Sequence, residues 1–130
     1  MDKKTRATLD DLIAAKLQRD KDKMQVKEIE IPSLGKTLLF KAPNDQQIID
    51  FMNESYGKND FSLVYEAYKK IIYLSCDELQ NQELINACEV NVPFDVIEKI
   101  MDGNDIMVVG DEICSMNRMY GNLENEIKNS

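Results

Sequence analysis

Apolar residues follow helical spacing along most of this chain, and the exception at residues 25–41 most constrains its fold. There, VKEIEI alternates between apolar and charged residues and is rich in β-branched side chains, which is typical of a strand. KTLLFK has the character of a second strand, and PSLG between them predicts a turn of about four residues. The sequence therefore predicts one β-hairpin. Because a lone hairpin is marginally stable in water, we expect it to pack on a helix or to self-associate through its edge.

Helical periodicity precedes the hairpin. Thr8, with Asp11 three residues later, matches a weak capping box, and the helix that follows has one apolar face. That face is formed by Leu9, Leu12, Ile13 and Leu17. The wholly charged segment RDKDK after it is expected to fray or to act as a linker.

Helical periodicity also follows the hairpin, and residues 44–120 predict a bundle of about five short helices. Four helix starts are marked by N-cap or first-turn residues, namely Asn44, Asp60, Pro93 and Asn104. Another short helix is expected near Gln82–Cys88. Gly121 is expected to stop the last helix. The predicted fold class is α+β and predominantly helical, and 130 residues suit a single domain. That domain comprises an N-terminal helix and charged linker (1–24), the hairpin (25–41), the bundle (44–120) and a flexible tail (121–130).

Histidine is absent, which excludes Ser-His-Asp and Cys-His catalysis and zinc sites built on histidine. The glycines do not have the spacing of a phosphate-binding loop, and no GxSxG motif is present. Residues 102–105 fail the ligand spacing of a calcium loop, and the adjacent acids Asp77-Glu78 and Asp111-Glu112 do not face each other on a helix. We therefore expect no enzyme, no cofactor and no metal site, although carboxylate or lysine catalysis remains an alternative.

The net charge of −8 argues against nucleic acid as the main partner. Residues 1–28 nevertheless hold eight basic and six acidic residues, a net charge of +2, which leaves −10 for the remainder. The basic ones are Lys3, Lys4, Arg6, Lys16, Arg19, Lys21, Lys23 and Lys27. They form either a solvated helix face or a contact for RNA or an acidic surface.

The three cysteines contain no CxxC pair, and the N-terminus lacks the apolar segment of a signal peptide. No stretch is long and apolar enough for a membrane span. Reduced thiols in a cytoplasmic protein are the expectation from these features.

Four of the seven methionines lie in the last thirty residues, next to a seam with helical spacing that ends at Tyr120. Because methionine is flexible and polarizable, such a group suits a surface that accepts varied apolar partners. The predicted partner-binding residues are Met101, Met107, Met116, Met119 and Tyr120. The alternative is that these side chains simply fill the core.

Three local patterns resemble the phage tail assembly chaperones of Gram-positive prophages, over roughly residues 8–121. They are the IPSLGK turn with its following strand, the helix junction that begins IIYLSC, and the PFDVIEKI helix followed by DIMVVGDEI. The resemblance implies a protein that coats the tape measure protein, recruits tail tube subunits around it, and is not retained in the virion. It would act in the cytoplasm of the bacterial host. Other possibilities are a head–tail connector and a small nucleic-acid-associated regulator.

Overall fold

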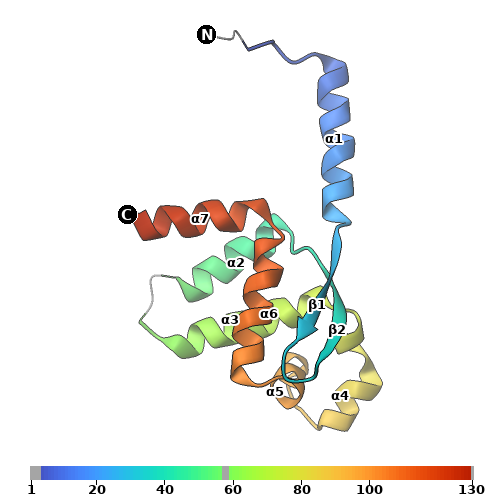
Figure 1. Ribbon diagram of the computed structural model, residues 1–130, viewed down its shortest axis with the longest axis vertical. Coiled ribbons are helices and arrows are strands. Elements are labelled where there is room, and N and C mark those ends of the chain that lie inside the picture. The colour runs from blue at the N-terminus through green and yellow to red at the C-terminus, as the bar shows by residue number, and fades with distance from the viewer. Residues whose placement is uncertain (1–3, 57–58, 130) are drawn as a thin grey trace.

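A computed structural model describes residues 4–56 and 59–129. For residues 124–129 it describes the backbone alone. It confirms an α+β, predominantly helical chain in which a helix and a hairpin precede a group of helices (Figure 1). The α-helices and strands are α1 Leu9–Lys23, β1 Val26–Ile31, β2 Lys36–Lys41, α2 Asp45–Ser55, α3 Phe61–Ser75, α4 Gln82–Cys88, α5 Val96–Ile100, α6 Gly103–Ser115 and α7 Arg118–Asn129. Short 3-10 turns, η1 Glu78–Gln80 and η2 Pro93–Asp95, precede α4 and α5.

The hairpin is antiparallel, with Val26 opposite Lys41 and Ile31 opposite Lys36. Its loop has the predicted four residues, and Gly35 adopts a positive φ of 63°, a conformation that glycine adopts without strain. One face is apolar and buried, and it is formed by Ile29, Ile31 and Phe40. The hairpin therefore packs on the helices of its own chain, one of the two expectations for it.

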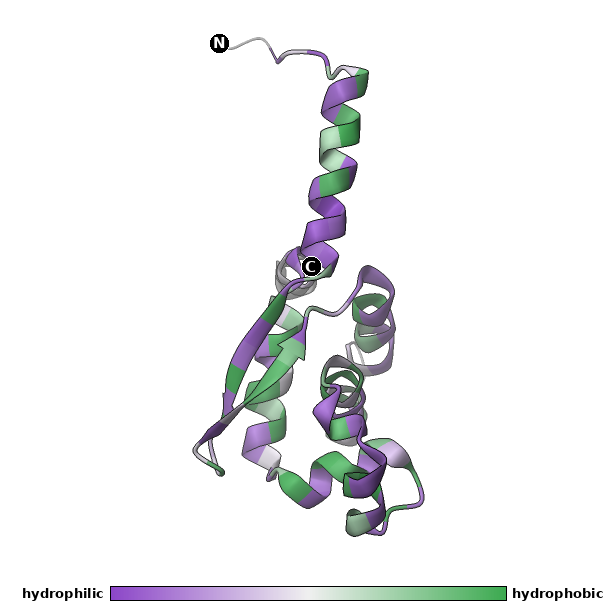
Figure 2. Ribbon diagram, turned by 90° about the vertical axis from the view of Figure 1, so that its right-hand side faces the viewer, coloured by the Kyte–Doolittle hydropathy of each residue, from purple (hydrophilic) through white to green (hydrophobic). Residues whose placement is uncertain are grey.

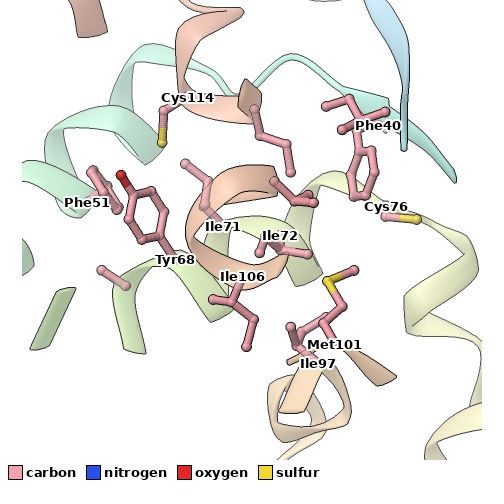
Figure 3. Packing of buried hydrophobic residues seen from close by; sticks show 14 of the residues in the cluster. Phe40, Phe51, Tyr68, Ile71, Ile72, Cys76, Ile97, Met101, Ile106 and Cys114 are labelled. Carbon is pink, nitrogen blue, oxygen red and sulfur yellow. The ribbon is translucent and has the colours of Figure 1, made fainter. Parts of the chain in front are cut away.

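The core is centred on α3, which packs against α6 on one side and α2 on another. Figure 3 shows Tyr68, Ile71 and Ile72 of α3 among side chains from several other helices and from β2. Gly110 of α6 lies directly against Tyr68, and a Cβ atom at Gly110 would come within 2.2 Å of the Tyr68 ring. The close approach of these two helices therefore depends on glycine at this position.

Asp105 joins the hairpin loop to the start of α6. Its carboxylate accepts hydrogen bonds from the Ser33 backbone N–H at 3.1 Å and from the Ser33 hydroxyl. It also accepts the N–H of Asp102 at 3.1 Å, which completes a capping box. Asp105 is buried, and burial by itself would raise its pKa, but the hydrogen bonds from Ser33 and Asp102 outweigh burial and lower the pKa below its ordinary value.

We expect Asp105→Asn to lower the free energy of unfolding at pH 7 by about 2 kcal/mol, because charged acceptors contribute more than neutral ones. Because the pKa of Asp105 is lowered in the folded state, its ionised carboxylate stabilises the fold fully above the unfolded-state pKa of about 3.9. This stabilisation is lost as the pH falls through the folded-state pKa. The difference between wild type and Asp105→Asn in urea unfolding should therefore shrink below about pH 4. Asp77→Asn, at an exposed carboxylate, is the control. An Asp105→Asn deficit that persists unchanged at acidic pH contradicts this account.

The predicted last helix is two helices. The spacing of apolar residues continues through Tyr120, but the chain turns at Met116 and Asn117. The Asn117 side chain donates hydrogen bonds to the Pro43 carbonyl and to Asp45, both at 3.0 Å, and accepts the N–H of Met119 at 2.9 Å. These contacts hold Asn117 beside the start of α2. Asn117 is the N-cap residue of the helix that follows, α7.

Three other sequence predictions are wrong. Gly121 does not end a helix, because α7 continues through residues 121–129, where a flexible tail was predicted; residue 130 lies outside the described residues. Asp102, not Asn104, caps α6, because only Asp102 has an acid at its third following position. The charged segment expected to fray is the helical end of α1.

Candidate partner-binding surface

The five residues predicted to bind a partner do not form one surface. Met101 and Tyr120 are buried, Met116 and Met119 are half-buried, and Met107 is 44% exposed. The neighbouring seam residues Ile106, Val109 and Ile113 are core residues of the same chain. The Tyr120 hydroxyl donates to Asp111 at 3.0 Å, which further fixes this residue inside the fold. Of the predicted set, Met107 has the most exposed side chain.

Among the described residues, one face of α1 is apolar and uncovered. Its four apolar side chains are exposed by 72% at Leu9, 60% at Leu12, 51% at Ile13 and 55% at Leu17. No residue of α1 is buried. The helix projects from the rest of the molecule, and Figure 2 shows apolar residues along it where no other element lies alongside. We call Leu9, Leu12, Ile13 and Leu17 the α1 stripe.

Local interactions define α1 from its own sequence. Thr8 and Asp11 form the predicted capping box, in which the Thr8 N–H donates to Asp11 at 2.9 Å and the Asp11 N–H donates to Thr8 at 3.2 Å. Lys16 and Asp20 form an ion pair within the helix at 2.6 Å. A single ion pair at 3.7 Å, Arg19 with Asp45, joins α1 to another described helix. Exposed pairs of this kind contribute less than about 1 kcal/mol, so they do not hold α1 against the body.

The amphipathic pattern of α1 has a physical implication. A helix of about 15 residues is marginally stable alone in water, and helices of this length normally gain stability by burying an apolar face. Here that face is exposed to solvent, since the described side chains of the chain leave it uncovered. The α1 stripe is therefore suited to contact with another protein.

Exposed apolar residues continue from α1 onto the hairpin. Val26 and Leu39 lie on the face of the hairpin that is directed away from the core, and both are exposed. In the register of the strands they are diagonal neighbours, within reach of each other. Met24, between α1 and β1, is also exposed. A partner that contacts the α1 stripe can therefore extend onto the hairpin.

Lys69 is the buried lysine that bears on the alternative of lysine catalysis. No motif in the sequence pointed to it. Its side chain is 1% exposed, and its ammonium contacts Glu66 at 3.0 Å, Asp95 at 2.8 Å and also Glu98. Burial alone would lower the pKa of Lys69, but the hydrogen bonds to the three carboxylates outweigh burial and raise the pKa above its ordinary value. An amine nucleophile needs the opposite shift, so Lys69 is suited to joining α3 to η2 and α5 and not to covalent chemistry.

The thiol of Cys76 is buried in surroundings that do not favour reaction. Burial raises its pKa, which disfavours the thiolate that acts as nucleophile or metal ligand. Among the described residues, no three cysteine, aspartate or glutamate side chains are placed to hold a metal ion. None of the helices in the described part of the chain combines the length and the apolarity needed to cross a membrane.

No protein family, curated protein or solved structure matches this chain. The surface and the buried groups described above are therefore the basis for inferring its function.

Proposed function

We propose that this chain is a non-catalytic assembly protein of the tail assembly chaperone kind, which binds the tape measure protein and recruits tail tube subunits. It would act in the cytoplasm of a bacterial host and would be absent from the finished virion. The observation that carries this proposal is the α1 stripe, a helical apolar face that its own chain leaves exposed. A long helical protein awaiting enclosure in a tube presents the complementary surface, and an amphipathic helix is the usual means of covering it.

The energetics of the stripe suit a temporary contact. Full burial of a leucine or isoleucine contributes about 1.5–3 kcal/mol, and side chains that are already part-buried gain about half of that. Four such residues offset the cost of association only modestly, so a single contact would be weak. Many copies along one rod would act together through avidity, and weak individual contacts permit release as the tube forms.

The distribution of charge on α1 argues for a protein partner over nucleic acid. Four acidic residues, Asp10, Asp11, Asp20 and Asp22, balance four basic residues, Lys16, Arg19, Lys21 and Lys23. A helix of zero net charge does not provide the cluster of cations that phosphate binding requires.

Co-expression with the tape measure protein tests the proposal. We expect a soluble complex that purifies through a tag on either protein, and we expect Ile13→Asp to reduce its yield by about tenfold, because a charge would be buried in the contact. Gln18→Asp introduces the same side chain on the opposite face of α1 and should leave the yield unchanged. A tape measure protein that stays insoluble and unbound, or purified tails that retain this chain, would reject the chaperone role.

A further inference from the structure

The outer edge of β1 is a strand edge to which no strand in the described part of the chain is paired. Ala42 donates its N–H to the Gln25 carbonyl at 2.9 Å, so alternate pairs of the hairpin from Gln25–Ala42 onward are hydrogen-bonded. Val26, Glu28 and Glu30 lie between those pairs and direct their backbone N–H and C=O groups away from β2. All three residues are exposed. An edge of this kind can accept another strand.

The β1 edge is acidic on one face. Glu28 and Glu30 are two positions apart on the strand, so both carboxylates lie on the outer face of the hairpin, away from the core. The ion pairs that the hairpin makes with the body involve its lysines instead, Lys27 with Glu112 and Lys41 with Asp77. Because opposite charges across neighbouring strands attract, this edge favours an added strand with basic residues at alternate positions.

The residues that precede α1 have this pattern. Lys4 and Arg6 alternate with the small residues Thr5 and Ala7, so in an extended chain the two basic side chains share one face. Residues 4–8 are exposed and belong to no helix or strand. Pairing with the β1 edge would therefore disrupt no existing element.

The segment before α1 cannot reach the β1 edge of its own chain. The segment precedes α1 and β1 follows it, and the 15 residues of α1 hold the two about 22 Å apart. Figure 1 shows the N-terminal segment at the end of α1 that is far from the hairpin. A second copy of the chain is not subject to this constraint, and it supplies the segment at the same concentration as the edge.

We propose that residues 4–7 of a second copy add to β1 as a third, antiparallel strand, with Arg6 opposite Glu28 and Lys4 opposite Glu30. A shift of two residues in either direction breaks one of these two charge pairs. The parallel orientation that pairs both charges would bring Thr8 alongside Pro32, past the end of β1. Antiparallel pairs are also the more stable per residue.

The added strand is short, which limits its affinity. It ends before Thr8, whose N–H and carbonyl are already bonded in the first turn of α1. Arg6 with Glu28 and Lys4 with Glu30 are both hydrogen-bonded pairs, so the contact comprises four backbone hydrogen bonds and two exposed ion pairs. Each of these contributes little in water, so association is weak and depends on concentration. This inference goes beyond the proposed function and does not rest on it.

Hydrogen exchange of the full chain alone, measured by NMR at about 50 μM and about 1 mM, tests the strand addition. We expect the backbone N–H groups of Glu28 and Glu30 to exchange at least about threefold more slowly at the higher concentration, because they then donate to the added strand. Thr37 and Leu39 present their N–H groups at the other edge of the hairpin, and their rates should not change. Equal rates for Glu28 and Glu30 at both concentrations, or slowing at Thr37 and Leu39 instead, overturns the proposal.

Charge exchange tests the pairing and its orientation. Arg6→Glu places two acids opposite each other and should raise the dissociation constant, measured by analytical ultracentrifugation at low salt, by about fivefold. Adding Glu28→Arg restores opposite charges in the antiparallel register, so the dissociation constant should return to within about twofold of wild type. Adding Glu30→Arg instead restores them only in the parallel orientation and should give no rescue.

Thermal unfolding should be the same in all these variants, because Arg6, Glu28 and Glu30 are exposed. A chain that stays monomeric at about 1 mM, or an Arg6→Glu variant that associates as wild type, contradicts the proposed pairing. Rescue by Glu30→Arg and not by Glu28→Arg rejects the antiparallel register. Because no tape measure protein is present, failure here is distinct from failure of the proposed function.

Discussion

Replacing Gly110 with alanine is expected to lower the free energy of unfolding by about 3 kcal/mol, the upper end of what overpacking usually costs. The added Cβ would lie 2.2 Å from Tyr68 Cδ1 and 2.7 Å from Cγ, which is inside the contact distance of any two carbon atoms. The Tyr68 ring has little freedom to move away, because it packs against Phe51 with the ring centroids 4.8 Å apart. Helices α3 and α6 must therefore separate at the centre of the core. Urea denaturation followed by circular dichroism measures the loss.

Gly103→Ala is the matched control for Gly110→Ala. Gly103 is the first residue of the same helix, and a Cβ there meets no atom within 4 Å. Alanine also restricts the unfolded chain, so this variant should be neutral or more stable by up to about 1 kcal/mol. If the two substitutions change the midpoint of unfolding equally, the close packing of α3 on α6 at Gly110 is not what stabilises the fold.

Replacing Lys69 with methionine is expected to lower the free energy of unfolding by about 2–3 kcal/mol. Methionine retains most of the side-chain volume but removes the cation that Glu66, Asp95 and Glu98 share. Breaking a buried ion pair by removing one partner costs about 3–5 kcal/mol, and we reduce that figure because the three carboxylates are each about 40% exposed to water. Loss of the cation leaves acids from α3, η2 and α5 to repel one another.

The next residue, Lys70, provides the control for Lys69→Met. Its ammonium has one carboxylate partner, Glu54 at 3.3 Å, and both side chains are well exposed. Lys70→Met should cost less than about 1 kcal/mol, as exposed pairs usually do. Equal losses for the two lysines in thermal or urea unfolding would show that the three-carboxylate arrangement around Lys69 contributes little.

The parts of the fold that the sequence predicted are those set by short-range interactions. The hairpin follows from the alternation of apolar residues at Ile29 and Ile31 and from a glycine where the loop needs a positive φ. The capping box at Thr8 and the cap at Asn44 are each contained within four residues of chain, and both formed as expected. The short helix near Gln82–Cys88 was also predicted and is confirmed.

The parts that the sequence did not predict depend on residues distant in the chain. Asn117 ends α6 because it hydrogen-bonds to Pro43 and Asp45, more than seventy positions away. Apolar spacing alone cannot reveal such a contact, and it predicted a continuous helix. Asp105 is a second case: the sequence prediction placed the cap of α6 at Asn104 and missed the capping box of Asp102 with Asp105, and the bonds of Asp105 to Ser33 required the fold.

The candidate surface shows a related limit. Sequence periodicity identified both the α1 stripe and the C-terminal seam as apolar helical faces, but it does not say which face the chain buries itself. The seam became core because α3 packs against it, and this left Met101 and Tyr120 inaccessible. The high charge of α1 beyond Leu17 was the available signal that this helix would remain outside the body.

The absence of buried residues in α1 has a consequence for how this chain can change over evolutionary time. In the role proposed above, substitutions on α1 would alter which molecules it binds without disturbing the packing of the hairpin and the remaining helices, because no residue of α1 is buried. Binding and folding would then be encoded in separate stretches of one short polypeptide. Binding specificity could then change through a few substitutions in α1, while the rest of the sequence stays under selection for packing.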